Sequence, residues 1–177
     1  MNIEGVLETN GMLRLFGRGN GATSDSTEAL DASCDIDIEH LFAHMSAPHL
    51  HAPPEPVNIM RFELGILRGM RLSFTDGALL PPSIDRNGHV VFLAAAEDSP
   101  DATQDGDVTG SVIGIIDYSV QPPTARYTEI LDEHGESLQS KAEGIAFRSD
   151  DPRTAYIVLD VDAADQASEL CEVRFLC

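Results

Sequence analysis

Three acidic residues recur at similar places along this chain and could share a cation. Each precedes a glycine and a small aliphatic residue at the opening of a strand-like run: Glu4-Gly5-Val6, Asp76-Gly77-Ala78 and Glu143-Gly144-Ile145. If the three runs are equivalent strands, these carboxylates converge on one axis, where like charges repel unless a cation lies between them. The pattern predicts a calcium site, since calcium is bound by several oxygen ligands. The alternative is that each carboxylate accepts backbone N–H groups at the start of its own strand.

Further acidic residues follow the second strand of two of these repeats. They are Glu97 and Asp98 in the middle of the chain, and Asp160 and Asp162 near its end. We expect them either to extend the cluster of carboxylates or to lie in solvated loops.

Other candidate chemistry is weaker. Histidines 40 and 44 share a face if residues 39–45 are helical, a spacing that can chelate zinc, and His49 and His51 follow in a proline-rich stretch. No glutamate follows His40 as a metalloprotease motif requires, so a surface insertion is the competing interpretation. No Gly-x-Ser-x-Gly segment is present, and this argues against the serine-hydrolase arrangement typical of that motif.

The elements that would position the acids form a repeat. The recurring openings, each followed by a turn and a second strand-like run, indicate an array of antiparallel sheets. We predict an all-β fold, a partial β-propeller of about three four-stranded blades, with units at residues 2–64, 70–132 and 141–177. The third unit lacks an outer strand. Because propellers hold roughly four to eight blades, we expect a fragment, a subunit whose ring is completed by a copy of itself, or one completed by another chain.

Five segments of the chain resemble a known group. They are Arg18-Gly19-Asn20-Gly21, Leu72-Ser73-Phe74-Thr75-Asp76-Gly77, Ala95-Ala96-Glu97-Asp98-Ser99-Pro100-Asp101-Ala102, Gly110-Ser111-Val112-Ile113-Gly114 and Lys141-Ala142-Glu143-Gly144-Ile145-Ala146-Phe147. In these segments the chain is similar to the second half of a poorly characterised bacterial β-propeller family, related to phytase-like (esterase-like) propellers and more remotely to gluconolactonase-like and strictosidine-synthase-like six-bladed enzymes. The resemblance implies a divalent cation near the axis, held by inner-strand carboxylates, onto which Glu4, Asp76 and Glu143 map.

Composition limits which partners we expect the chain to bind and where in the cell we expect it. The 177 residues carry a formal net charge of -19, which opposes binding to nucleic acid and to anionic membranes. No apolar run is long enough to span a bilayer, and the first residues do not form a signal peptide. Unless an upstream leader has been lost, we expect a cytoplasmic protein. Three cysteines without CxxC spacing, Cys34, Cys171 and Cys177, indicate reduced thiols.

Three functions remain open at this stage. The first is a β-propeller with a divalent cation, calcium, at its axis. The second is a calcium-dependent lactonase, esterase or phosphoesterase, in which the metal polarises a carbonyl or phosphoryl oxygen and a carboxylate acts as base. The third is a non-catalytic propeller that binds a ligand or a protein.

Overall fold

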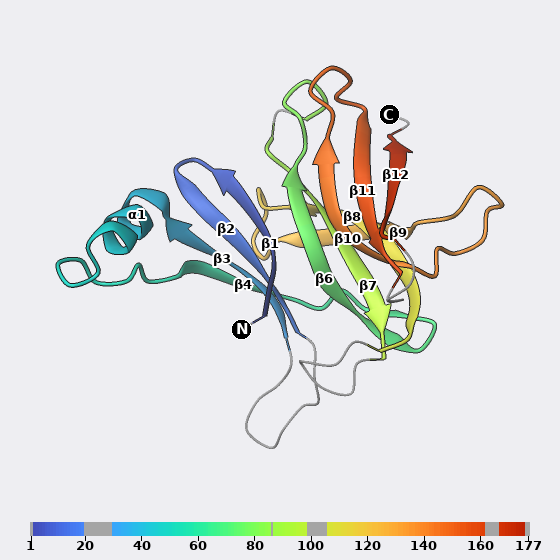
Figure 1. The fold of residues 1–177 in the computed structure, drawn as a ribbon, viewed down its shortest axis with the longest axis horizontal. Coiled ribbons are helices and arrows are strands. Elements are labelled where there is room, and N and C mark those ends of the chain that lie inside the picture. The colour runs from blue at the N-terminus through green and yellow to red at the C-terminus, as the bar shows by residue number, and fades with distance from the viewer. Residues whose placement is uncertain (1, 20–29, 86, 99–105, 162–166, 176–177) are drawn as a thin grey trace.

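The computed structural model describes residues 2–19, 30–85, 87–98, 106–161 and 167–175, which fold into antiparallel β-sheets and one helix (Figure 1). Sheet 1 contains β1 (Asn2–Thr9), β2 (Met12–Arg18), β3 (Asp31–Asp37) and β4 (Val57–Phe62). Sheet 2 contains β5 (Ile66–Leu67), β6 (Met70–Leu79), β7 (Val90–Glu97), β8 (Val108–Asp117) and β9 (Thr124–Glu129). Sheet 3 contains β10 (Lys141–Phe147), β11 (Thr154–Asp160) and β12 (Glu169–Arg174). The all-β prediction is confirmed for these residues.

Local sequence explains the strands and their turns. Asn10 and Gly11 join β1 to β2 with φ angles of 52° and 76°, the left-handed values that a two-residue hairpin turn favours and that asparagine and glycine tolerate. In β11, buried and exposed residues alternate over its central part, as in a strand with one covered face. The seven residues from Val90 to Ala96 in β7 are all buried, because that strand is covered on both faces.

The one helix lies outside the stacked sheets. Helix α1 (Ile38–Ser46) begins at Asp37, whose side chain accepts a hydrogen bond from the backbone N–H of His40 at 2.7 Å. This is a standard N-cap. The predicted helix over residues 39–45 is therefore confirmed, and none of its residues is buried. It is too short to cross a bilayer, and no helix among the described residues is long and apolar enough to do so.

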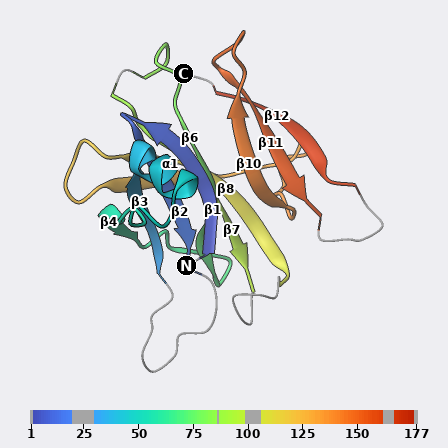
Figure 2. The same ribbon diagram turned by 60° about the vertical axis from the view of Figure 1, so that its left-hand side comes forward.

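The three sheets stack with their first strands side by side (Figures 1 and 2). Strand β6 of sheet 2 lies between β1 of sheet 1 and β10 of sheet 3. One apolar core fills the space between sheets 1 and 2 around Phe16, Phe74 and Phe92. A second core fills the space between sheets 2 and 3 around Leu93 and Ile157. Sheet 2 is therefore the central layer, with apolar side chains on both faces.

A β-bulge repeats in all three first strands and defines which residues are equivalent. The extra residue is Glu4 in β1, Thr75 in β6 and Glu143 in β10, and in each strand the next residue resumes the pairing. Asp76 is thus equivalent to Gly5 and Gly144, one position beyond Glu4 and Glu143. The sequence-based alignment of the three acids is wrong by one residue in sheet 2, because the Asp-Gly pair there follows the bulge instead of occupying it.

Strand number also differs between the sheets. Counted from β1, β6 and β10, each sheet has three consecutive antiparallel strands. Sheets 1 and 2 have a further strand beside the third, which is β4 in sheet 1 and β9 in sheet 2. In the described residues no strand pairs with the outer edge of β12 in sheet 3. The expected four strands are found in sheet 1, sheet 2 has the short additional strand β5, and sheet 3 has three.

Candidate functional site

Asp76 lies where the three first strands meet, and its carboxylate is used by the backbone. Its Oδ2 accepts a hydrogen bond from the N–H of Ile145 in β10 at 2.8 Å. On the other side, a Cβ added to Gly5 in β1 would lie 3.0 Å from its Oδ1. Burial raises the pKa of Asp76, while the N–H groups of Ile145 and Gly77 oppose this rise. These contacts fit the structural alternative, in which the carboxylate satisfies strand N–H groups.

Glu4 and Glu143 have neighbours on their own strands. The side-chain amide of Asn2 donates a hydrogen bond to Glu4, and the ammonium group of Lys141 lies 3.0 Å from Oε1 of Glu143. Within the described residues, no group of three or more His, Cys, Asp or Glu side chains could hold a metal ion. The first strands do lie together, as the repeat predicts, but their acids do not form such a group.

Glu97 is the centre of a buried ionic junction that joins the three sheets at one end. Its carboxylate contacts the guanidinium of Arg18 from β2 and lies 3.4 Å from Nζ of Lys141 in β10. The backbone N–H of Gly106 also donates to it at 2.9 Å. The side chains of Glu97, Arg18 and Lys141 are only 1%, 3% and 4% exposed. The alternative of a solvated loop position for Glu97 is therefore wrong: it ends a strand that packs between two sheets.

The charges of this junction stabilise one another. Burial lowers the pKa of Lys141, but the hydrogen bond to Glu143 and the negative charges of Glu97 and Glu143 outweigh it, so the net shift is upward. Lys141 is consequently a fixed ammonium ion. With two cations placed around it, Glu97 is a structural counter-ion, since buried charges need such pairing.

The remaining predicted acids lie near the same end. Asp98 is exposed, and its backbone N–H donates to the carbonyl oxygen of Asp107 at 3.2 Å. Asp160 ends β11 and, with Lys141, lines a small polar cavity of about 390 Å³. Asp162 lies outside the described residues.

Asp31 is a second fully buried carboxylate, and the sequence did not indicate it. It is 0% exposed and accepts hydrogen bonds from the backbone N–H groups of Phe74 and Gly19 at 2.9 and 3.2 Å. Arg71 lies 3.1 Å from its other oxygen. Burial raises the pKa of Asp31, and these donors oppose the rise. Its role is to tie β3 of sheet 1 to β6 of sheet 2.

The histidines behave as a surface feature. Nδ1 of His44 lies 2.8 Å from the carbonyl oxygen of His51, and both residues are on the outside of the molecule together with His40 and His49. Elsewhere, His89 lies between two carboxylates, with Asp85 at 3.0 Å and Asp117 at 3.3 Å. No local pattern in the sequence indicates this pairing, which links the turn before β7 to the end of β8.

The two cysteines in the described residues are reduced thiols, as the sequence predicts. Cys34 is 3% exposed and Cys171 is partly buried, and both are free thiols. Burial raises the pKa of both thiols, and the nearby charges of Asp35 and Glu169 raise them further. Neither is therefore an activated nucleophile. Cys177 lies outside the described residues.

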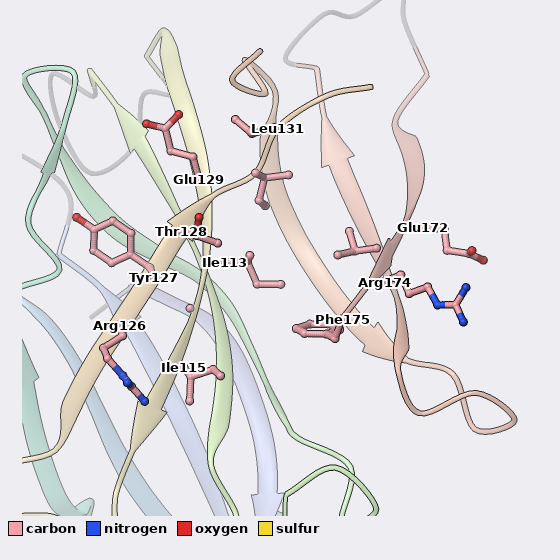
Figure 3. Close-up of a pocket in the computed structure, with 13 residues that line it drawn as sticks. Ile113, Ile115, Arg126, Tyr127, Thr128, Glu129, Leu131, Glu172, Arg174 and Phe175 are labelled. Atoms are coloured by element: carbon pink, nitrogen blue, oxygen red, sulfur yellow. The ribbon is translucent and has the colours of Figure 1, made fainter. Parts of the chain in front are cut away.

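A concave feature that the repeats did not suggest is an apolar groove between sheets 2 and 3 (Figure 3). It has a volume of about 720 Å³, within the usual range for ligand sites. Thr128 and Arg126 of β9 stand opposite Ile113 and Ile115 of β8 and share their face. The remaining lining includes Ile130, Leu131, Val173 and Phe175. Figure 3 shows Ile113 and Phe175 directed into the groove and Glu172 and Arg174 directed away from it.

The groove exists because the sheets diverge away from their first strands. Strands β6 and β10 are in close contact, whereas the outer strands β9 and β12 are separated by the groove. In sheet 1 and sheet 2 the place next to the third strand is occupied by β4 and β9. Beside β12 the corresponding place borders the groove.

Comparisons with known proteins give one match. A protein-family model covers residues 1–166, and its description is a family of unknown function, DUF6910. No curated protein and no solved structure matches the chain.

Proposed function

The chain belongs to this family of unknown function, DUF6910, and we propose that it is a non-catalytic, propeller-like binding protein that accepts an extended apolar peptide strand on the edge of β12. The single observation that carries the proposal is the outer edge of β12, with which no strand of the described residues pairs, beside an apolar groove of about 720 Å³. An extended peptide would pair with β12 as a fourth strand, and its alternate side chains would enter the groove.

The other two sheets support this choice of occupant. Strands β4 and β9 fill the corresponding place in sheets 1 and 2. Strand β9 packs Ala125 of sheet 2 against the core that sheet 2 shares with the preceding sheet 1, as the bound strand would place apolar side chains against Val173 and Phe175 between sheet 3 and the preceding sheet 2. The net charge of -19 favours a peptide with basic flanking residues.

The three stacked sheets support a propeller-like arrangement. Their first strands lie side by side and share a bulge at equivalent positions. A blade array needs such a repeat, in which each sheet packs on the next near a common axis. The number of blades in a complete ring is part of the proposal.

A calcium-dependent hydrolase is the competing proposal, and the contacts of the acids favour it less. Asp76 already accepts strand N–H groups, and Glu143 is paired with Lys141. A calcium site on the folded protein would raise its melting temperature when millimolar calcium is added to chelated protein. We expect no change, and a rise of several degrees would favour the metal site.

A peptide-binding assay tests the main proposal. The probe is a synthetic peptide with the sequence of residues 56–63, which includes β4 and therefore already forms a fourth strand in sheet 1. We expect saturable binding, measured by calorimetry or by anisotropy of a labelled peptide. Thr128→Arg puts a long charged side chain on an exposed, groove-lining position and should weaken binding at least tenfold.

The matched control is Thr124→Arg. Thr124 is an exposed threonine of the same strand and on the same face, but it does not line the groove. Equal binding by the two variants, or no binding by the parent protein, would reject the peptide site. Binding of an apolar dye such as Nile red without binding of the peptide would replace the peptide with a small apolar ligand.

A further inference from the structure

Sheets 1 and 3 each turn one face away from the rest of the molecule. Sheet 2 is covered by a sheet on both sides, whereas no other sheet among the described residues packs on these outer faces (Figures 1 and 2). The outer face of sheet 1 carries Val6 and Ile59, which are 54% and 61% exposed. The outer face of sheet 3 carries Val158 and Leu170, which are 43% and 66% exposed. Both faces therefore carry exposed apolar side chains.

The shared bulges identify the residues of sheets 1 and 2 that are equivalent to Val158 of sheet 3, and those residues are covered. Val158 stands opposite Gly144, the first residue after the bulge of sheet 3. The residues in the same position are Phe16 in sheet 1 and Leu93 in sheet 2. Both are 0% exposed, because the following sheet packs on them. Val158 is therefore a core position that lacks its following sheet.

The same comparison applies to the outer face of sheet 1. Val6, two positions after the bulge, pairs with Leu15, and Leu15 pairs with Cys34. In sheet 3 the equivalent row is Ile145, Ile157 and Cys171, and it packs against sheet 2, with Ile157 only 1% exposed. The row in sheet 1 has the same apolar character, and no sheet of the described residues precedes it. Its Val6 is 54% exposed, whereas Cys34 is only 3% exposed.

We propose that the outer face of sheet 3 in one copy of the chain stacks on the outer face of sheet 1 in a second copy, and reciprocally, so that two copies close a ring of six sheets. Each contact would repeat the stacking already present inside the chain. Six sheets lie within the usual range of about four to eight blades. Such burial removes large exposed apolar patches, which ordinarily mark interfaces.

Charge is compatible with the pairing of unlike faces. Arg61 stands opposite Ala32 on the outer face of sheet 1 and is exposed. Glu172 stands opposite Tyr156 on the outer face of sheet 3, with its side chain 56% exposed. Contacts between unlike faces place Arg61 and Glu172 on opposite sides of the interface. Arg174 shares the face of Glu172, and Arg148 lies 3.5 Å from Glu172, so the outer face of sheet 3 carries both signs of charge and the proposal rests on the apolar rows. The residues substituted to test this proposal do not line the groove, so the peptide assay and the association assay can fail separately.

Sedimentation velocity between about 1 and 100 µM protein tests the proposal. We expect a dimer for the parent chain, and at least tenfold weaker association for both Val158→Asp and Val6→Asp. Because each variant keeps one intact face, an equimolar mixture of the two should recover dimers through the remaining intact pair. Association should also strengthen between about 50 and 500 mM salt, since salt screens the repulsion between two chains of net charge -19.

Phe42→Asp is the matched control, because Phe42 is a 60% exposed apolar residue on the helix and not on either face. It should leave the dimer unchanged. Circular dichroism establishes that each variant is folded, and Leu170→Asp and Ile59→Asp replace any that is not. A monomeric parent chain, equal association of the variants and the parent, or a mixture that remains monomeric would overturn the proposal. Growth into open filaments would reject the closed pair.

Discussion

Replacing Glu97 with glutamine removes the anion that holds two buried cations together. Glutamine keeps the size of the side chain and its acceptor oxygen, but it has no charge to balance Arg18 and Lys141, whose side chains are 3% and 4% exposed. Breaking a buried ion pair by removing one partner costs about 3–5 kcal/mol. Because Glu143 still balances part of the charge of Lys141 at 3.0 Å, we expect a loss near the lower end, about 3 kcal/mol.

That loss is large compared with the stability of a folded protein, which is roughly 5–15 kcal/mol. In a chain of this length, each kcal/mol shifts the melting temperature by about 2–4 °C, so the variant should melt roughly 6–12 °C lower. The assay is urea and thermal unfolding followed by far-ultraviolet circular dichroism, since the chain has no tryptophan. Glu133→Gln is the control, because its side chain is 87% exposed and its contact with His134 is at the surface. This control should lie within about 0.5 kcal/mol of the parent.

A triple replacement separates the loss of pairing from a loss of packing. Arg18→Met, Glu97→Leu and Lys141→Met together remove all three buried charges, and such apolar replacements are often neutral or stabilising. We expect this variant to recover most of the stability that Glu97→Gln loses. A Glu97→Gln variant as stable as the parent would refute the account of the junction, because the two cations would then need no buried counter-ion.

Two further substitutions test the contacts that β6 makes with the neighbouring sheets. Burial raises the pKa of Asp76, so the stability from this group is greatest below its usual pKa and declines as the pH rises through the raised value. Asp76→Asn has no carboxyl group to titrate and therefore lacks this decline. Its melting temperature relative to the parent should increase over that pH window and then level off. A constant difference in melting temperature between pH 3.5 and 8 would contradict the raised pKa of Asp76. Gly77→Ala would place a Cβ 2.8 Å from the ring of Phe16 and should cost about 1–3 kcal/mol in urea unfolding. In Gly144→Ala the nearest atom is 3.7 Å away, so an equal cost for both variants would show that the ring of Phe16 is not the cause.

Much of the local structure follows from the sequence because its signals are short-range. The Asn10-Gly11 turn, the helix beginning at Ile38 and the runs that form β6 and β11 are set by turn chemistry, capping and side-chain alternation. The repeated openings also indicated correctly that three first strands lie together. A bulge leaves no such local signal, and for that reason the acid of the second repeat was aligned one position away from Glu4 and Glu143.

The sites themselves depended on tertiary structure. Arg18 and Glu97 are 79 residues apart in sequence, and only the stacking of three sheets makes them a buried pair. Asp31 is an ordinary acidic residue in the sequence until β6 brings the N–H of Phe74 to it. The groove arises from the divergence of β9 and β12. Sequence alone determined which segments are strands, because alternation acts over a few residues; the packing of sheets decided which charges are buried and which apolar faces remain open, because those depend on contacts between distant segments.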